Sequence, residues 1–259
     1  MKRDYKNQVI WIIGASSGIG RALSIELSNR GATLLLSARR NDELTNLGSL
    51  LQNPSDIYPL DVSREESVMQ TVDNIYKKYI NVDRIIYLAA AYTPMKIDQL
   101  NPQTYKTIID VNINGAFHLV HALIPFLKKH VHSGDKKNPK PQIALCGSVA
   151  GYIGLPAGQP YSATKAAIMN LAESMKAECK DYMDVRLISP GFVKTALTDK
   201  NQFKMPALLS AEDAAIAIAD GLLKNSFEIH FPKRFTLFLK TLRILPYWIA
   251  LALTEKIKT

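Results

Sequence analysis

Cysteine is scarce in this 259-residue sequence, which holds only Cys146 and Cys179. Two thiols without a pairing pattern provide no disulfide framework, which is typical of proteins from a reducing compartment. Residues 1–6 (MKRDYK) lead directly into an apolar run, without the apolar core of a secretory signal peptide. We therefore expect a cytoplasmic protein, and we assign Cys146, on a predicted strand, to the hydrophobic core.

The sequence also lacks an internal repeat, a low-complexity tract and an interdomain linker. The apolar run at 244–253 is far shorter than the roughly 20 residues that a membrane-spanning helix needs. The chain length is ordinary for a single α/β unit, and a hydrophobic fraction of 47% supports a sizeable core. We therefore expect one domain at 1–230 and an apolar and basic tail at 231–259.

The formal net charge of +9 suits nucleic acid, anionic lipid or an anionic substrate as a partner. No nucleic-acid motif is present, and the positive residues are dispersed apart from the tail and a segment at 128–141. An anionic membrane surface is therefore favoured over nucleic acid. The segment at 128–141, broken by proline and glycine, is expected to be an exposed loop. Its His130 and His132 have no third ligand nearby, so we expect no metal site.

Apolar strand patterns alternate with helical patterns along the whole chain. This alternation is typical of a doubly wound parallel sheet with helices on both faces, here with about seven strands. The predicted strands are 8–13, 33–37, 56–60, 84–88, 142–146, 185–189 and 227–229. The predicted helices are 19–29, 42–52, 64–78, 99–130 with a break near Val111, 161–180 and 211–224.

A glycine-rich turn, GASSGIG, joins the first predicted strand to the first helix. Gly14, Gly18 and Gly20 allow a tight turn and let a pyrophosphate approach the backbone. The N-terminus of the following helix presents free N–H groups and the positive end of its dipole. The strand, turn and helix together predict a phosphate-binding site of the Rossmann type.

Three polar side chains further along form an acid/base unit. Tyr161 follows Ser148 by thirteen residues, and Lys165 follows Tyr161 by four. Tyr161 and Lys165 are one helical turn apart, so both project from the same face of a helix. A nearby ammonium favours the phenolate and should lower the Tyr161 pKa from its usual value near 10. Tyr161 is therefore a candidate proton carrier.

With these motifs the chain resembles the short-chain dehydrogenase/reductase family over nearly its whole length. The glycine loop, Asp61-Val62 after the third strand, Asn112, the Ser148/Tyr161/Lys165 set and the run from Pro190 to Thr195 match that family's motifs in order. The resemblance implies a catalytic tetrad of Asn112, Ser148, Tyr161 and Lys165. It implies a cofactor site that includes Gly14, Ser16, Ser17, Gly18, Ile19, Gly20, Arg39, Asp61, Val62, Ala89, Tyr161, Lys165, Pro190, Gly191, Val193 and Thr195.

The sequence departs from the family pattern at two places. Ile13 stands where the family usually has threonine, and Tyr87-Leu88-Ala89-Ala90 replaces the usual Asn-Asn-Ala-Gly. Replacing both partners of a polar contact by apolar groups can be nearly neutral, whereas losing one leaves the other unsatisfied. We interpret the two departures as a repacked core that leaves the tetrad intact.

The end of the second strand, LSARR at 36–40, bears on the choice of cofactor. NAD enzymes of this type tend to carry an acid there for the ribose 2′-hydroxyl, whereas this chain has Ala38 followed by Arg39 and Arg40. A guanidinium binds a 2′-phosphate through charge-assisted contacts. We therefore expect NADP(H), with Arg39 as the contact that the resemblance implies.

The resemblance implies an oxidoreductase that interconverts a carbonyl and an alcohol. Ser148 and Tyr161 would hold the carbonyl oxygen, Tyr161 would transfer the proton, and Asn112 would hold a water that links Lys165 to solvent. The segment between Thr195 and Ser210 should form a lid. Apolar side chains in the lid and before Tyr161 favour an apolar ketone or aldehyde: Phe203, Met205, Leu208, Leu209, Tyr152, Ile153 and Leu155.

The tail combines an apolar helical stripe with basic residues. Phe235, Phe238, Leu239, Leu242 and Leu245 fall at helical spacing, and Tyr247 and Trp248 follow the helix-breaking Pro246. Flanking lysines and arginines favour an anchor that lies in the plane of a membrane surface. Packing on the domain, on another subunit or on the substrate pocket is the alternative. The resemblance also implies self-association through the helices that begin near Val111 and Tyr161, as a dimer or tetramer.

Two other functions are compatible with a cofactor-binding fold. A non-catalytic nucleotide-binding scaffold would have no physical need for the complete tetrad. A sugar-nucleotide epimerase or dehydratase needs a longer substrate domain than the roughly 70 residues beyond Ser189. An enzyme that reduces or oxidises a small carbonyl or alcohol substrate is therefore the favoured function.

Overall fold

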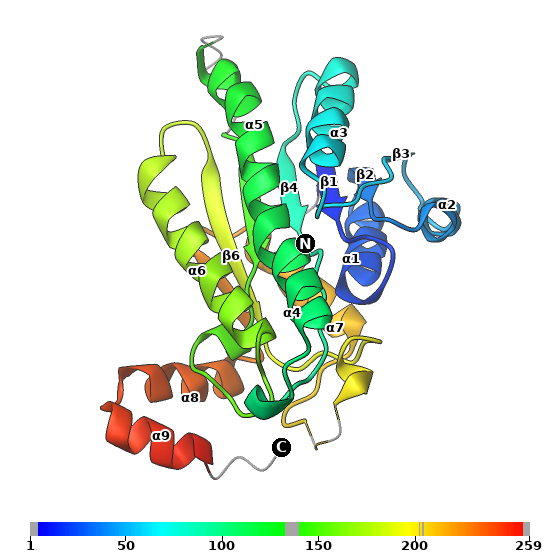
Figure 1. Ribbon diagram of the computed structural model, residues 1–259. Coiled ribbons are helices and arrows are strands. Elements are labelled where there is room, and N and C mark those ends of the chain that lie inside the picture. Colours follow the sequence, from blue (N-terminus) through cyan, green and yellow to red (C-terminus); the bar gives the residue numbers. More distant parts are fainter. Residues whose placement is uncertain (1–4, 133–139, 202, 204, 256–259) are drawn as a thin grey trace.

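The computed structural model describes residues 5–132, 140–201, 203 and 205–255. The described residues form one sheet of seven parallel strands in the order β3-β2-β1-β4-β5-β6-β7. The expected doubly wound α/β fold is confirmed (Figure 1). The strands are β1 Val9–Ile13, β2 Thr33–Ser37, β3 Ser55–Ile57, β4 Arg84–Tyr87, β5 Gln142–Cys146, β6 Asp184–Pro190 and β7 Glu228–Phe231.

Helices cover both faces of this sheet, which gives one hydrophobic core on each face. Successive residues of a strand point alternately into the two cores. Trp11 and Ile13 point into the core beneath α3, α5 and α6, while Ile10 and Ile12 point into the core beneath α1 and α7. Burial on both faces explains why the central strands β1 and β2 are mostly apolar. The helices are α1 Gly18–Asn29, α2 Asn41–Gly48, α3 Glu65–Lys78, α4 Pro102–Ile109, α5 Gly115–His132, α6 Tyr161–Glu178, α7 Ala211–Leu222, α8 Lys233–Ile244 and α9 Tyr247–Glu255.

The long helix expected at 99–130 is interrupted where the sequence predicts a break. A π-helical turn at Asp110–Asn114 separates α4 from α5. The two helices and this turn form one apolar stretch, Pro102–Lys129, which by length and composition alone could cross a membrane. Half of its most apolar window is buried inside the protein, and α5 packs on α3. We therefore interpret the stretch as a core helix.

Several boundaries differ from the sequence prediction, among them the end of α2, which is at Gly48 and not at Gln52. The third strand ends at Ile57 and not at Leu60, although the N–H groups of Tyr58 and Leu60 still donate to β2 and the residue after it. Helix α5 continues to His132, into the segment expected to be a loop, because residues 128–132 contain neither proline nor glycine. The rest of the expected loop, 133–139, and the side chains of His130 and His132 lie outside the described residues.

The C-terminal segment continues the domain. Strand β7 extends to Phe231, across the expected boundary, and pairs with β6. On α8, Thr236, Leu239 and Leu242 are buried, and the two leucines join the core beneath α6. Figure 1 places α8 and α9 below the carboxyl ends of the strands, where α6 begins. One face of the expected tail therefore packs on the domain.

Candidate functional site

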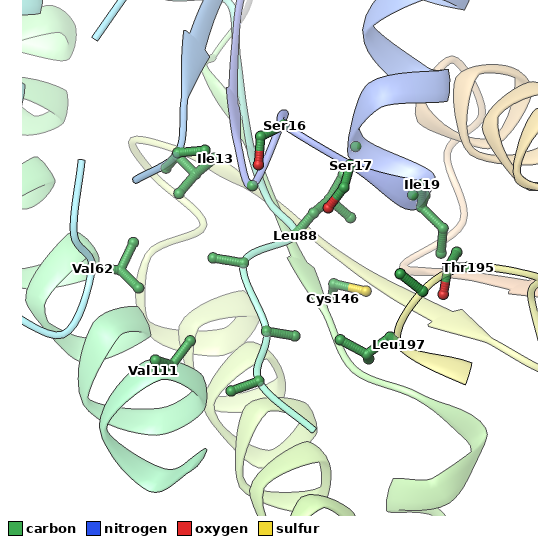
Figure 2. A pocket seen from close by; sticks show the side chains of 18 of the residues that line it. Ile13, Ser16, Ser17, Ile19, Val62, Leu88, Val111, Cys146, Thr195 and Leu197 are labelled. Atoms are coloured by element: carbon green, nitrogen blue, oxygen red, sulfur yellow. The ribbon is translucent and has the colours of Figure 1, made fainter. Parts of the chain in front are cut away.

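A cavity of about 470 Å³ lies where the loops after β1, β2, β4, β5 and β6 meet at the carboxyl ends of the strands. Strand order reverses between β1 and β4, which is where ligands bind in open α/β sheets. In Figure 2 the cavity lies between the glycine loop with Ser16 and Ser17, the pair Val62 and Val111, and Leu197. Of the site residues predicted from the sequence, the cavity wall includes Gly14, Ser16, Ser17, Gly18, Ile19, Gly20, Arg39, Asp61, Val62, Ala89, Ser148, Tyr161, Lys165, Pro190, Gly191, Val193 and Thr195.

The glycine loop has the shape of a phosphate cradle. Gly14 has φ +97°, and a Cβ there would lie 2.7 Å from the Ala89 nitrogen; a Cβ at Gly20 would collide with the Gly14 carbonyl oxygen. Helix α1 begins at Gly18, and the Ser17 side chain makes no capping hydrogen bond to its first turn. The helix therefore presents its first N–H groups toward the cavity, as a bound phosphate requires.

Two arginines stand at the end of β2 beside this cradle. Both Arg39 and Arg40 line the cavity and are exposed. Arg40 Nη2 lies 3.1 Å from Ser16 Oγ in the glycine loop, and Arg40 Nη1 lies 3.7 Å from Glu43 Oε1. The sequence reasoning singled out Arg39, whereas the structure also brings Arg40 against the phosphate loop. The cavity wall at this end is cationic and would accept an additional phosphate.

Ser148, Tyr161 and Lys165 meet at the opposite end of the cavity from these arginines. Ser148 follows β5, and its Oγ accepts a hydrogen bond of 3.1 Å from the Ala150 N–H. Tyr161 is the first residue of α6, and Lys165 lies one turn later, with its Nζ 5.5 Å from the centre of the Tyr161 ring. Lys165 is buried and donates a hydrogen bond of 2.8 Å to the Cys146 carbonyl oxygen. The three groups expected to form an acid/base unit are thus brought together.

Burial dominates the electrostatics of this end of the cavity. It raises the pKa of Tyr161 above its ordinary value, and a hydrogen bond with Ser148 acts in the opposite direction. Burial also lowers the pKa of Lys165. The direction for Tyr161 is opposite to the lowering expected from Lys165, because desolvation of the phenolate, with Cys146 and Tyr92 acting in the same direction, outweighs the Ser148 hydrogen bond. The raised pKa favours the protonated phenol at neutral pH.

Asn112, the fourth predicted catalytic residue, lies behind the cavity wall. Its Oδ1 accepts from the Ala91 N–H at 2.7 Å, and its Nδ2 donates to the Ala91 carbonyl at 3.0 Å and to Thr164 Oγ1 at 2.9 Å. It is almost completely buried and ties the segment after β4 to α6. Its expected role in holding a water stays a prediction.

Comparison with known proteins decides the family. Residues 8–205 match the model of the short chain dehydrogenases. The chain belongs to the short-chain dehydrogenase family.

Relatives and solved structures agree with this membership. An uncharacterized oxidoreductase of Staphylococcus epidermidis is 31% identical over 222 residues, which are 85% of this chain and 93% of the relative. A short-chain dehydrogenase from Burkholderia phymatum, solved with NAD, has a TM-score of 0.80 at 20% identity and covers 92% of this chain and 93% of its own. One from Burkholderia cenocepacia, solved with NADP, has a TM-score of 0.80 at 20% identity and covers 99% of both chains. At this identity the two structures show the fold alone.

The two sequence departures within this short-chain dehydrogenase form a repacked core only in part, because Ile13 and Tyr87 are buried whereas Leu88, Ala89 and Ala90 are partly exposed and line the cavity. Ile13 is buried, and its carbonyl oxygen accepts from the Leu88 N–H at 2.8 Å. Tyr87 is buried, and its hydroxyl donates to the Val111 carbonyl in the π-helical turn. Gly115, at the start of α5, leaves room for this phenol, since a Cβ there would lie 2.5 Å from Tyr87 Oη. The sequence predicts an apolar replacement here and does not reveal the hydrogen bond from Tyr87 to the Val111 carbonyl.

Tyr92 is a second site residue that the sequence reasoning missed. Its ring packs edge-on against the Tyr161 ring at 4.8 Å between centroids. Its hydroxyl donates to Asn201 Oδ1 at 2.6 Å, and its carbonyl accepts from Lys200 Nζ at 2.8 Å. Tyr92 therefore connects the predicted lid to Tyr161, the predicted proton carrier. The only signal in the sequence was its position shortly after β4.

The remaining predicted positions of this short-chain dehydrogenase have clear local roles. Asp61 follows the third strand and accepts hydrogen bonds from the N–H and hydroxyl of Ser63. Cys146 is buried as expected but also lines the cavity, and burial raises the pKa of its thiol. Among the residues that the structure describes, no group of three His, Cys, Asp or Glu side chains is placed to hold a metal ion.

Proposed function

We propose that this protein is an NADP(H)-dependent oxidoreductase that interconverts an apolar carbonyl compound and its alcohol. One observation carries the proposal: Ser148, Tyr161 and Lys165 converge at one end of a cavity whose other end is a glycine cradle with adjacent arginines. Membership of the short-chain dehydrogenase family supports the coarser activity, that of an oxidoreductase.

The residues present fit a dinucleotide. The glycine loop provides open backbone for a pyrophosphate, because a Cβ at Gly14 or Gly20 would fill that space. Val62 and Leu60 offer apolar contact for an adenine ring, and the loop from Pro190 to Thr195 would close over the nicotinamide. When bound, the nicotinamide supplies or accepts the hydride.

The preference for NADP(H) rests on charge. Arg39 and Arg40 stand where NAD enzymes tend to carry an acid, and Ala38 provides no acceptor for a ribose 2′-hydroxyl. Two guanidinium groups would bind a 2′-phosphate through forked, charge-assisted hydrogen bonds. The similar structures include one solved with NAD and one solved with NADP, so the preference is argued from this chain's own residues.

The catalytic side chains bind the reacting oxygen and move its proton. In reduction, the hydroxyls of Ser148 and Tyr161 donate hydrogen bonds to the substrate carbonyl oxygen and so stabilise the charge that develops there. Tyr161 then transfers its proton to that oxygen as a hydride reaches the carbonyl carbon, which gives the alcohol. The Lys165 ammonium, with its Nζ 5.5 Å from the centre of the Tyr161 ring, stabilises the resulting phenolate, and a proton from solvent then restores the phenol.

The proposed substrate class follows from the side chains around the lid. Phe203 packs edge-on against Phe192 at 5.6 Å, and Phe192 packs against Phe235 at 5.8 Å. Tyr92 and Leu197 add apolar surface next to Tyr161 and the cavity. The three phenylalanines and Tyr92 do not line the cavity itself. Their apolar surface around the lid, with Leu197 in the cavity wall, favours an apolar ketone or aldehyde over a sugar, because burying sugar hydroxyls requires polar partners.

A binding titration followed by a substrate screen tests the proposal. The purified protein is titrated with NADPH and with NADH while nicotinamide fluorescence is recorded, and carbonyl compounds of increasing chain length are then screened with the preferred cofactor. We expect selective NADPH binding and higher kcat/KM for apolar carbonyls. Binding of neither cofactor would contradict the proposal and favour a non-catalytic scaffold.

A further inference from the structure

Helices α8 and α9 expose large apolar side chains. Ile244 is 82% exposed, Tyr247 81% and Trp248 76%, and all three lie at the junction of the two helices. Leu237 and Phe238 on α8 and Leu251 on α9 are also exposed. We call this set the α8–α9 face. Single exposed apolar residues are ordinary on proteins, but a contiguous group of this size usually marks an interaction site.

The opposite side of α8 is fixed to the domain, so the α8–α9 face has a defined direction. Thr236, Leu239 and Leu242 are buried beneath it. Lys240 pairs with Glu228 of β7, and Glu228 also accepts a hydrogen bond from Tyr152 in the segment between Ser148 and Tyr161. The helix is therefore attached to the wall of the catalytic site by both packing and an ion pair.

Basic residues accompany the apolar ones on α8. Lys233, Arg234 and Arg243 are exposed. Arg234 lies three residues before Leu237 and four before Phe238, so the guanidinium is next to both side chains on the helix surface. Within the described part of α8 and α9 the only acidic residue is Glu255, at the end of α9. The face is thus both apolar and positively charged.

This combination decides between two occupants, an anionic membrane and a second copy of the chain. Two-fold pairing of α8 with itself would bring like charges together without an acidic partner on that helix. An anionic lipid surface instead satisfies the basic residues while its interior takes up the apolar ones, and Trp and Tyr favour the boundary between the two. We propose that the α8–α9 face docks in the plane of an anionic membrane surface.

Docking in this way would turn the entrance of the catalytic site toward the membrane. Helix α8 begins beside the loop after β6, where Phe235 packs against Phe192. In Figure 1, α8 and α9 lie at the same end of the molecule as the start of α6, which carries Tyr161. If the proposed function holds, on which this step rests, the substrate would be an apolar carbonyl compound dissolved in the bilayer.

Vesicle binding tests the docking without cofactor or substrate. The full chain is mixed with vesicles of phosphatidylcholine alone or of phosphatidylcholine with phosphatidylglycerol, and binding is followed by co-sedimentation and by tryptophan emission. Trp248 is exposed and Trp11 is fully buried, so a blue shift on docking would report Trp248. We expect binding to the anionic vesicles that weakens at high salt.

Matched variants test whether vesicle binding depends on the α8–α9 face or is non-specific adsorption of the protein. R234E/R243E should weaken binding to anionic vesicles about tenfold or more, and F238S/I244S should abolish the emission shift. The controls are K77E and I80S on the far side of the domain, where Ile80 is 91% exposed; both should bind as the unmodified protein does. Equal binding by all variants, or no binding to either vesicle, would overturn the proposal. Concentration-dependent self-association that F238S/I244S removes, without vesicle binding, would overturn it in favour of a second copy.

Activity assays then separate this proposal from the proposed function. Reduction of a water-soluble carbonyl should be unchanged in R234E/R243E, whereas reduction of a carbonyl held in anionic vesicles should fall about tenfold. If no carbonyl is reduced under any condition, the proposed function fails, while the vesicle experiment still decides whether the face docks.

Discussion

The Tyr87 hydroxyl donates a hydrogen bond of 2.7 Å to the carbonyl oxygen of Val111, the residue before Asn112. That carbonyl lies in the π-helical turn between α4 and α5, where the regular helical pattern of hydrogen bonds is broken. A phenol that extends from the central sheet therefore supports the turn that carries Asn112. In this chain the support comes from a tyrosine at a position where the resemblance leads one to expect asparagine.

Removing only this hydroxyl should destabilise the protein. Tyr87→Phe leaves the buried Val111 carbonyl without its donor, and we expect a loss of about 1–3 kcal/mol in the free energy of unfolding. Urea unfolding followed by far-UV circular dichroism measures the change. Tyr247→Phe is the control, since Tyr247 is 81% exposed. If the two variants are equally stable, the hydrogen bond from Tyr87 to Val111 makes no net contribution to the free energy of unfolding.

Tyr161→Phe should abolish turnover and spare cofactor binding. The phenyl ring keeps the packing against Tyr92, but the proton donor is gone, so kcat should fall by about 10²–10⁴ or more. Steady-state rates and a fluorescence titration with NADPH provide the two measurements. Loss of NADPH binding in this variant would count against the assigned role.

Arg39→Ala and Arg40→Ala should each weaken NADPH binding and leave NADH binding nearly unchanged. Removing a charge-assisted contact to a phosphate costs about 1.5–3 kcal/mol, or roughly tenfold to a hundredfold in Kd. Lys77→Ala, an exposed basic residue on α3, is the control. If the two cofactors lose affinity equally in both arginine variants, the arginines do not select the 2′-phosphate.

The two directions of the reaction should respond differently to pH. Burial raises the pKa of Tyr161 above its ordinary value of about 10, so the phenol stays protonated through neutral and mildly alkaline pH. Reduction, which needs the protonated phenol, should stay level and fall only at still higher pH. Oxidation needs the phenolate and should rise about tenfold per pH unit over pH 6–9. Profiles of kcat/KM in both directions test this, and an oxidation profile that levels off near pH 7 would mean that Lys165 outweighs burial.

Gly20→Ala should abolish cofactor binding without unfolding the protein. The added Cβ collides with the Gly14 carbonyl oxygen, so the loop must shift away from the shape that admits a pyrophosphate. Gly154→Ala is the matched control, because nothing lies within 4 Å of a Cβ at that position. Thermal unfolding and NADPH titration of both variants make the comparison. Tight binding of NADPH by Gly20→Ala would contradict the assignment of the glycine loop as the pyrophosphate site.

The sequence was sufficient for the fold and for most of the cavity wall because both depend on local patterns. Mostly apolar strands that alternate with helical patterns, and the glycine turn after Ile13, predict the sheet and the cradle without any knowledge of distant contacts. The contact between Tyr92 and Tyr161 was not predictable in this way, since it depends on how the segment after β4 folds over α6. The raised pKa of Tyr161 was missed for a related reason: spacing reveals neighbouring charge but not burial. Self-association and a cytoplasmic location stay predictions.

The close approach of Gly115 to the Tyr87 phenol makes these two positions a single unit for protein engineering. A helix-stabilising Gly115→Ala change, which would ordinarily gain about 0.5–1 kcal/mol, should instead be harmful because the new methyl group meets Tyr87 Oη. Combined with Tyr87→Phe, the same alanine should recover part of that loss, so the effects of the two changes should not add. Attempts to make this chain more thermostable should therefore vary residues 87 and 115 together.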